Sequence, residues 1–131
     1  MKKLKRLLET IEFDHCGPIA SSEVKRHEDS LDLKFGPIFR SYLTEYGCIA
    51  HGANELYGIC GNNDSVPSAI HATRSARRDS GFRKDLVVVA DDGSGRKMCV
   101  DSNDMIHILD RNTCSESGQS FEDFAVEWLG R

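Results

Sequence analysis

The sequence lacks a long apolar run, and it lacks a segment that would direct export. No stretch approaches the roughly 20 apolar residues that a membrane-spanning helix needs. Basic residues at positions 2–6 resemble the start of a signal peptide, but acidic residues at 9–14 interrupt the apolar segment that should follow. We therefore expect a cytoplasmic protein with no membrane partner.

Paired cysteine motifs are also missing. The five cysteines are odd in number, widely spread and form no CxxC pair. They are Cys16, Cys48, Cys60, Cys99 and Cys114. Without an export signal, free thiols in a reducing compartment are expected and disulfides are not. A zinc site needs four converging ligands, but the chain offers only Cys48-x-x-His51 with Cys60 nearby, so the sequence predicts buried thiols and no metal.

Positive charge is in deficit. The chain has 17 lysines and arginines against 21 acids, for a net charge of −4. This balance disfavours broad contact with a polyanion. Arg74, Arg77 and Arg78 share one side of a predicted helix, yet no aromatic platform is interleaved, and a solvated or ion-paired face is the preferred interpretation. We expect no direct contact with nucleic acid, whereas a basic protein partner would suit the charge.

What is present is enough for one folded unit. A chain of 131 residues with 39% hydrophobic content supports one core. The sequence therefore predicts a single domain over residues 1–131.

Helical spacing and capping signals predict five helices. Apolar residues recur at helical spacing near both ends of the chain. Gly36-Pro37 is a start signal for the clearest helix, and Gly47 falls where a left-handed residue would end it. Ser65 is the expected cap of the fourth helix, and Ser120, with Asp123 three residues on, caps the fifth. The predicted helices span about residues 2–13, 21–30, 37–46, 67–78 and 121–129.

Strand signals fill the space between these helices. Short strands are expected at 48–50 and 55–59 around a turn at 51–54, with a loop at 61–64. The β-branched run at 86–90 does not alternate, which is typical of a strand covered on both faces or of one at the centre of a sheet. Turn chemistry at 91–95 predicts a hairpin with 97–100, followed by a turn at 101–104, a strand at 105–110 and a polar loop at 111–119. The result is an α+β fold with a central, mostly antiparallel sheet flanked by helices.

Catalytic and cofactor motifs are not found. There is no nucleophile elbow and no signature around any cysteine. Residues 91–95 do not have the alternating acids of a calcium loop, and no helix follows them to bind phosphate. The sequence therefore predicts no enzyme, no catalytic residue and no cofactor, with a small enzyme of unrecognised type as the remaining alternative.

Acidic turns supply the candidate contact residues. Turns project side chains into solvent, and neither turn contains a basic residue. The candidates for partner binding are Asp91, Asp92, Asp101 and Asp104, with Tyr57 as an aromatic neighbour. The alternative is that these aspartates are present for backbone reasons alone, because Asp and Gly favour turns.

The order of these segments resembles the SUKH superfamily, which includes fungal cell-wall-assembly regulators and many bacterial immunity proteins. Glu55-Leu56-Tyr57-Gly58-Ile59 is similar to the strand bearing the family's "lyGi" core, and Phe39-Arg40-Ser41-Tyr42-Leu43 to its long helix. In this chain Lys34-Phe35-Gly36 stands where the family has a proline before that helix. The remaining matches are the opening helix from 19, the hairpin at 86–101 and the closing helix at 120–129. The resemblance covers residues 19–129, and the helix before it has no counterpart.

The resemblance implies a non-enzymatic protein that binds and neutralises a cognate toxin domain, such as a nuclease. A basic toxin would match the acidic balance of the chain. The alternative from another class is a regulatory scaffold module that binds signalling or cell-wall proteins, as the fungal members do.

Overall fold

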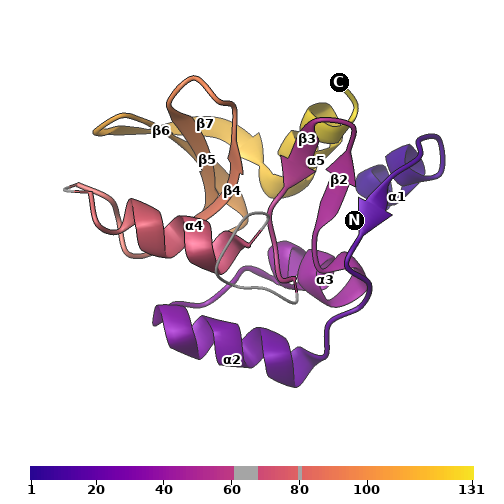
Figure 1. Ribbon diagram of the computed structural model, residues 1–131, viewed down its shortest axis with the longest axis horizontal. Helices are drawn as coiled ribbons and strands as arrows, with labels where there is room; N and C mark the ends of the chain where they lie inside the picture. Colours follow the sequence, from indigo (N-terminus) through magenta and orange to yellow (C-terminus); the bar gives the residue numbers. More distant parts are fainter. Residues whose placement is uncertain (61–67, 80) are drawn as a thin grey trace.

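The computed structural model describes residues 1–60, 68–79 and 81–131 and confirms the α+β class (Figure 1). Its strands form two antiparallel sheets, ordered β1-β2-β3 and β4-β5-β6-β7. The sheets meet where the Tyr57 N–H donates to the Val89 carbonyl at 2.7 Å. The strands are β1 (Asp14–His15), β2 (Ile49–His51), β3 (Asn54–Leu56), β4 (Val87–Asp91), β5 (Arg96–Val100), β6 (Met105–Asp110) and β7 (Thr113–Ser120).

The helices follow the predicted order, with α1 shorter than expected. They are α1 (Lys2–Leu8), α2 (Ser21–Leu31), α3 (Pro37–Tyr46), α4 (Ala69–Ala76) and α5 (Phe121–Leu129). Ser120 caps α5 as predicted, since its side chain accepts a hydrogen bond from the Asp123 N–H. Ser68 does the same for α4. The predicted loop at 61–64, the expected cap Ser65, and positions 67 and 80 lie outside the described residues.

The predicted polar loop at 111–119 is wrong. These residues form most of β7, which pairs with β6 from Asp110↔Thr113 to Met105↔Ser120. Most of its side chains are exposed, so no apolar alternation marks it as a strand. Backbone pairing to β6 on one side is what defines β7.

Strand β4 is covered on both faces, as the non-alternating run at 86–90 predicts. Val87 and Val89 belong to the larger core, whereas Val88 belongs to a smaller one with Ala72 and Ala76 of α4. The Val88 N–H also donates to Thr73 Oγ1 of α4 at 2.9 Å. Figure 1 shows α4 beside this sheet and α2 as an outer layer beyond α3. No helix among the described residues is both long and apolar enough to cross a bilayer.

The start of α3 is built by a residue far along the chain. Asp104, in the turn between β5 and β6, accepts hydrogen bonds from the N–H groups of Ile38 and Phe39, each at 2.9 Å. A Cβ on Gly36 would collide with the Asp104 carboxylate, which explains the glycine ahead of Pro37. The Asp104 carbonyl also accepts from the Phe121 N–H at 2.7 Å. One turn therefore holds the N-termini of both α3 and α5.

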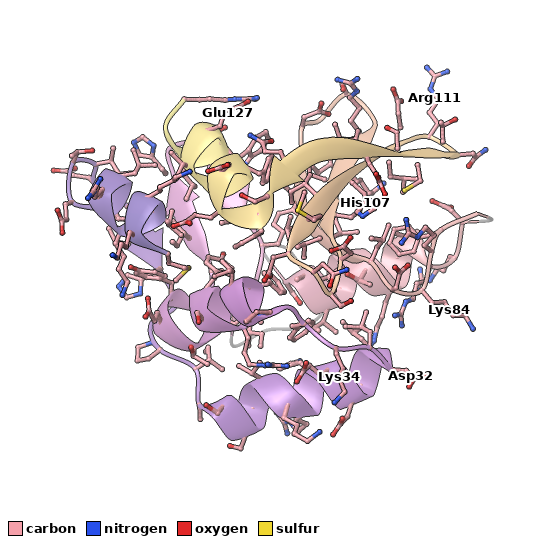
Figure 2. All side chains as sticks on the ribbon, turned by 180° about the vertical axis from the view of Figure 1, so that it is seen from behind. Asp32, Lys34, Lys84, His107, Arg111 and Glu127 are labelled. Carbon is pink, nitrogen blue, oxygen red and sulfur yellow. A yellow bond between two sulfur atoms is a disulfide. The ribbon has the colours of Figure 1, made fainter. Side chains whose placement is uncertain are left out.

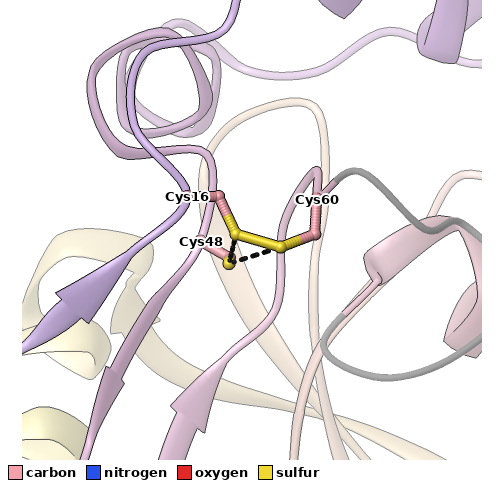
Figure 3. A group of neighbouring side chains, drawn as sticks. All are labelled: Cys16, Cys48 and Cys60. Carbon is pink, nitrogen blue, oxygen red and sulfur yellow. Dashed lines mark hydrogen bonds between the residues drawn. A yellow bond between two sulfur atoms is a disulfide. The ribbon is translucent and has the colours of Figure 1, made fainter.

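The expectation of five free thiols is also wrong. Cys16 and Cys60 form a disulfide, with the Cys48 thiol beside it (Figure 3). Their separation of 44 residues follows no short motif, and the three sulfurs meet only because the strands of the first sheet bring their ends together. Spacing alone could not reveal this pairing.

Candidate partner-binding site

A groove lies between the four-stranded sheet and α5. Its volume is about 140 Å³, and its apolar floor combines residues of β5, β6 and α5. The floor is formed by Met98, Ile106, Ile108, Phe124 and Trp128, and the polar rim by Asp92, Arg96, Ser117, Gln119, Glu127 and Arg131. An apolar floor with a mixed polar rim is the usual anatomy of a surface that binds another molecule.

Strand pairing and helix periodicity position the floor. Met98 on β5 lies directly opposite Ile108 on β6, so both side chains project from the same face. Phe124 and Trp128 follow one another by one helical turn and stack, with ring centroids 5.7 Å apart. The Trp128 Nε1–H donates to the Glu55 carbonyl of β3 at 2.9 Å. The floor is therefore held rigidly by both sheets.

Opposite charges alternate along the rim. The Arg131 guanidinium lies 5.0 Å from the Trp128 ring centroid and 3.6 Å from Glu127. Glu127 also accepts from the Gln119 side chain at 3.0 Å. In Figure 2 Glu127 lies on the side of α5 that faces away from α2 and α3. These groups are exposed, and each pair contributes little to stability, so they remain available to a partner.

Asp92 stands on this rim, at the turn between β4 and β5. Hydrogen bonds from the Ser94 hydroxyl and N–H lower the pKa of Asp92 below its ordinary value. The carboxylate is therefore charged at neutral pH. Asp92 therefore places a charge at the rim of the groove, and its contact role stays a prediction.

Asp91 faces the opposite side of the sheet and lies beside Tyr57. Both line a second hollow of about 150 Å³, together with His71 and Lys97. Burial raises the pKa of the Tyr57 hydroxyl, and the charges of Asp91 and Glu55 raise it further. The structure thus brings the predicted aromatic neighbour next to Asp91, whereas Asp92 is directed to the other face.

The two remaining candidates are engaged inside the protein. Burial would raise the pKa of Asp101, but hydrogen bonds from His107 and from the Met105 and Asn103 N–H groups outweigh it and leave the pKa lowered. Figure 2 marks His107 on β6. This buried histidine places its Nε2 2.8 Å from Asp101 Oδ2. Asp104 is only 7% exposed. The expectation that turn carboxylates project into solvent is wrong for Asp104, because it caps α3.

Sequence reasoning predicted the helix that carries Phe124 and Trp128, and both residues are buried at 6% exposure. It missed that they also form the floor of a groove, and it missed Glu127 and Arg131 on the rim. The available signal was the spacing of Glu127 and Arg131, which lie four residues apart at the end of the chain. They could not be linked to β5 and β6 without the tertiary structure.

One group of metal-ligating side chains stands out among residues 1–60, 68–79 and 81–131. It consists of Cys16, Cys48 and Cys60. His51 is not part of this group of converging ligand atoms; its Nδ1 lies 2.5 Å from the Leu129 carbonyl, at the end of α5. The Cys48-x-x-His51 pair is therefore not a ligand pair.

Comparisons with known proteins agree on the fold. The model of the SUKH_5 family, described as SMI1-KNR4 cell-wall, matches residues 2–130. A crystal structure of a protein from Pseudomonas syringae pv. tomato superposes with a TM-score of 0.80 at 17% identity, covering 99% of this chain and 98% of the other. No curated protein matches the chain significantly. At this identity the structural likeness bears on the fold alone.

Proposed function

Because the chain belongs to the SUKH_5 family of SMI1-KNR4 proteins, we propose that it is a cytoplasmic immunity protein that binds and neutralises a cognate toxin domain. Family membership is the observation that carries this proposal, since the SUKH superfamily includes many immunity proteins. The protein acts by binding and performs no chemistry of its own. Its toxin is a basic domain such as a nuclease, which suits the net charge of −4.

The contact surface we propose surrounds the turn between β4 and β5. Asp92 lines the groove on one face, and Asp91 lies with Tyr57 at the hollow on the other. A basic loop of the toxin would pair with these carboxylates while an apolar side chain enters the groove above Trp128. Asp101 and Asp104 are left out of this surface, because their carboxylates bind His107 and the start of α3.

The test begins with the gene neighbourhood: a toxin-like reading frame beside this one would supply the domain for co-expression with the chain. We expect the chain to restore growth and to bind the purified domain with an association rate that falls as salt rises. Asp91→Lys with Asp92→Lys should slow association and flatten its salt dependence. Glu9→Lys with Glu12→Lys is the matched control, since it changes net charge equally at exposed positions near α1.

If both double variants lose the same share of the association rate, the effect comes from net charge alone. The turn between β4 and β5 is then not part of the contact surface. Absence of both binding and protection with the wild-type chain would refute the immunity role. The alternative is a regulatory scaffold module that binds signalling or cell-wall proteins, which the family's description as SMI1-KNR4 cell-wall favours. Co-purification of cell-wall enzymes, without protection from any toxin, would support it.

A further inference from the structure

The Cys16, Cys48 and Cys60 sulfurs converge from three separate segments of the first sheet (Figure 3). Cys16 directly follows β1, Cys48 directly precedes β2, and Cys60 lies beyond β3. Cys48 Sγ lies 2.6 Å from Cys16 Sγ and 3.4 Å from Cys60 Sγ. All three sulfurs lie within 4.8 Å of one another.

Backbone contacts hold these segments together independently of the disulfide. The Cys16 N–H donates to the carbonyls of Tyr46 and Cys48 at 3.1 and 3.3 Å. The Ile59 N–H donates to the Gly47 carbonyl at 2.9 Å, which fixes the segment that carries Cys60. Gly47 has φ +72, and a side chain there would press on the Gly17 backbone. The three cysteines are therefore expected to remain close when the disulfide is reduced.

We propose that the reduced protein binds one thiophilic divalent cation of the zinc type through the Cys16, Cys48 and Cys60 thiolates. Zinc–sulfur bonds of about 2.3 Å place tetrahedral thiolates about 3.8 Å apart. The Cys48–Cys60 pair, at 3.4 Å, is already near this spacing, whereas Cys16 Sγ must move away from Cys60 once the disulfide opens and from Cys48, which lies 2.6 Å away. Soft thiolates select such ions over magnesium or calcium. Three ligands from three segments make a site that no short motif would show.

The fourth coordination position faces solvent. The cluster borders a surface hollow that Asp14, His15 and Ile49 also line, and Cys16 is exposed. His15 Nδ1 accepts a hydrogen bond from the Gly17 N–H at 2.9 Å, which directs that nitrogen to the backbone. Water therefore completes the tetrahedron, as in zinc sites with three protein ligands.

The disulfide and the ion are alternative states of the same sulfurs. A phosphine or dithiol reductant supplies two electrons, and with two protons the Cys16–Cys60 bond becomes two thiols. Metal binding then releases the thiol protons to solvent. Hydrogen peroxide reverses this: it accepts two electrons from the Cys16 and Cys60 thiolates and two protons from solvent, leaves as two water molecules, and the ion is lost as the disulfide forms.

The test titrates the reduced full chain with Co²⁺ under anaerobic conditions, followed by displacement with Zn²⁺. We expect thiolate-to-cobalt charge-transfer bands and tetrahedral ligand-field bands that saturate at one ion per chain. Cys48→Ser should weaken Zn²⁺ binding at least about 100-fold, the upper end of what changes outside the ligand set cause. Cys114→Ser is the control and should bind like wild type, because Cys114 lies on β7.

Cys48→Ser leaves the Cys16–Cys60 disulfide available, so its oxidised form reports whether the variant folds. If that form is not native, Cys60→Ser in the reduced state serves instead, with the same expected loss. The proposal is overturned if reduced wild type gives no thiolate-to-cobalt band, or if both variants bind Zn²⁺ within about threefold of wild type. Release of bound Zn²⁺ by peroxide, with loss of two thiols per ion, would support the exchange of states.

Discussion

Asp104→Ala would remove the carboxylate that starts α3 from a different part of the chain. The Ile38 and Phe39 N–H groups would lose their acceptor at an almost fully buried position. Loss of a capping side chain costs about 0.5–2 kcal/mol, and each buried donor left unpaired costs about 1–3 kcal/mol. Asp104 also has φ +60, where alanine is strained by about 1–2 kcal/mol. The lost cap and the unpaired donors are the same two hydrogen bonds and count once, so with the strain we expect the free energy of unfolding to fall by at least about 3 kcal/mol.

Two further variants separate capping from strain. Asp104→Asn keeps one side-chain oxygen, and asparagine tolerates the left-handed backbone. The free energy of unfolding of this variant should therefore fall by only about 1–2 kcal/mol. Asp104→Gly relieves the backbone strain but removes the cap, and it should fall between the other two. Urea unfolding at neutral pH gives all three values. An alanine variant within about 1 kcal/mol of wild type would refute the capping role, because its energy must exceed that of an ordinary surface change.

Three other outcomes are expected. Trp128→Ala and Phe124→Ala should each destabilise by about 3–5 kcal/mol in denaturant unfolding; wild-type stability with lost partner binding would contradict the core assignment. Reduction of the Cys16–Cys60 disulfide in the presence of EDTA should cost about 2–4 kcal/mol, because the bond closes a long loop, and identical unfolding midpoints before and after reduction would oppose this. Burial, and to a lesser extent Arg26 and Arg74, lower the pKa of His27 despite the opposing effect of Glu23. The unfolded chain therefore binds this proton more readily, and stability should fall as pH drops below about 6.5. The free energies of unfolding of the wild type and of His27→Gln should be compared between pH 7.5 and pH 5. The difference between them should change over that range, and a constant difference would show that His27 protonation does not affect stability.

Elements with local start and stop signals could be predicted from the sequence. Gly36-Pro37 and Gly47 bound α3, and Ser120 begins α5 through its hydrogen bond from the Asp123 N–H. The alternating strand at Met105–Asp110 was predicted with its observed bounds. In each case the capping or side-chain period that specifies the element lies inside the element itself.

Features that depend on distant residues could not be predicted. The Cys16–Cys60 bond requires the first sheet to form, and Asp104 caps a helix that begins more than sixty residues earlier. An aspartate in a turn has the same sequence signature whether it serves its own turn or another element. The candidate site was likewise predicted only in part. Asp91 and Asp92 could be predicted as a charged turn, whereas the groove between the sheet and α5 could not be predicted.

The position of β7 limits how another protein can approach. Among the described residues it is the outer strand of its sheet, and a backbone edge of this kind can be extended by a strand from a neighbour. Glu116 places a charge along this edge, Gly118 has φ +76, and the pairing with β6 shifts register between Met105 and His107. Charge and irregularity of this kind discourage strand addition. A partner would therefore be recognised by side chains on the faces of the sheet, so that specificity depends on shape and charge, which can diverge quickly between related proteins without altering the backbone.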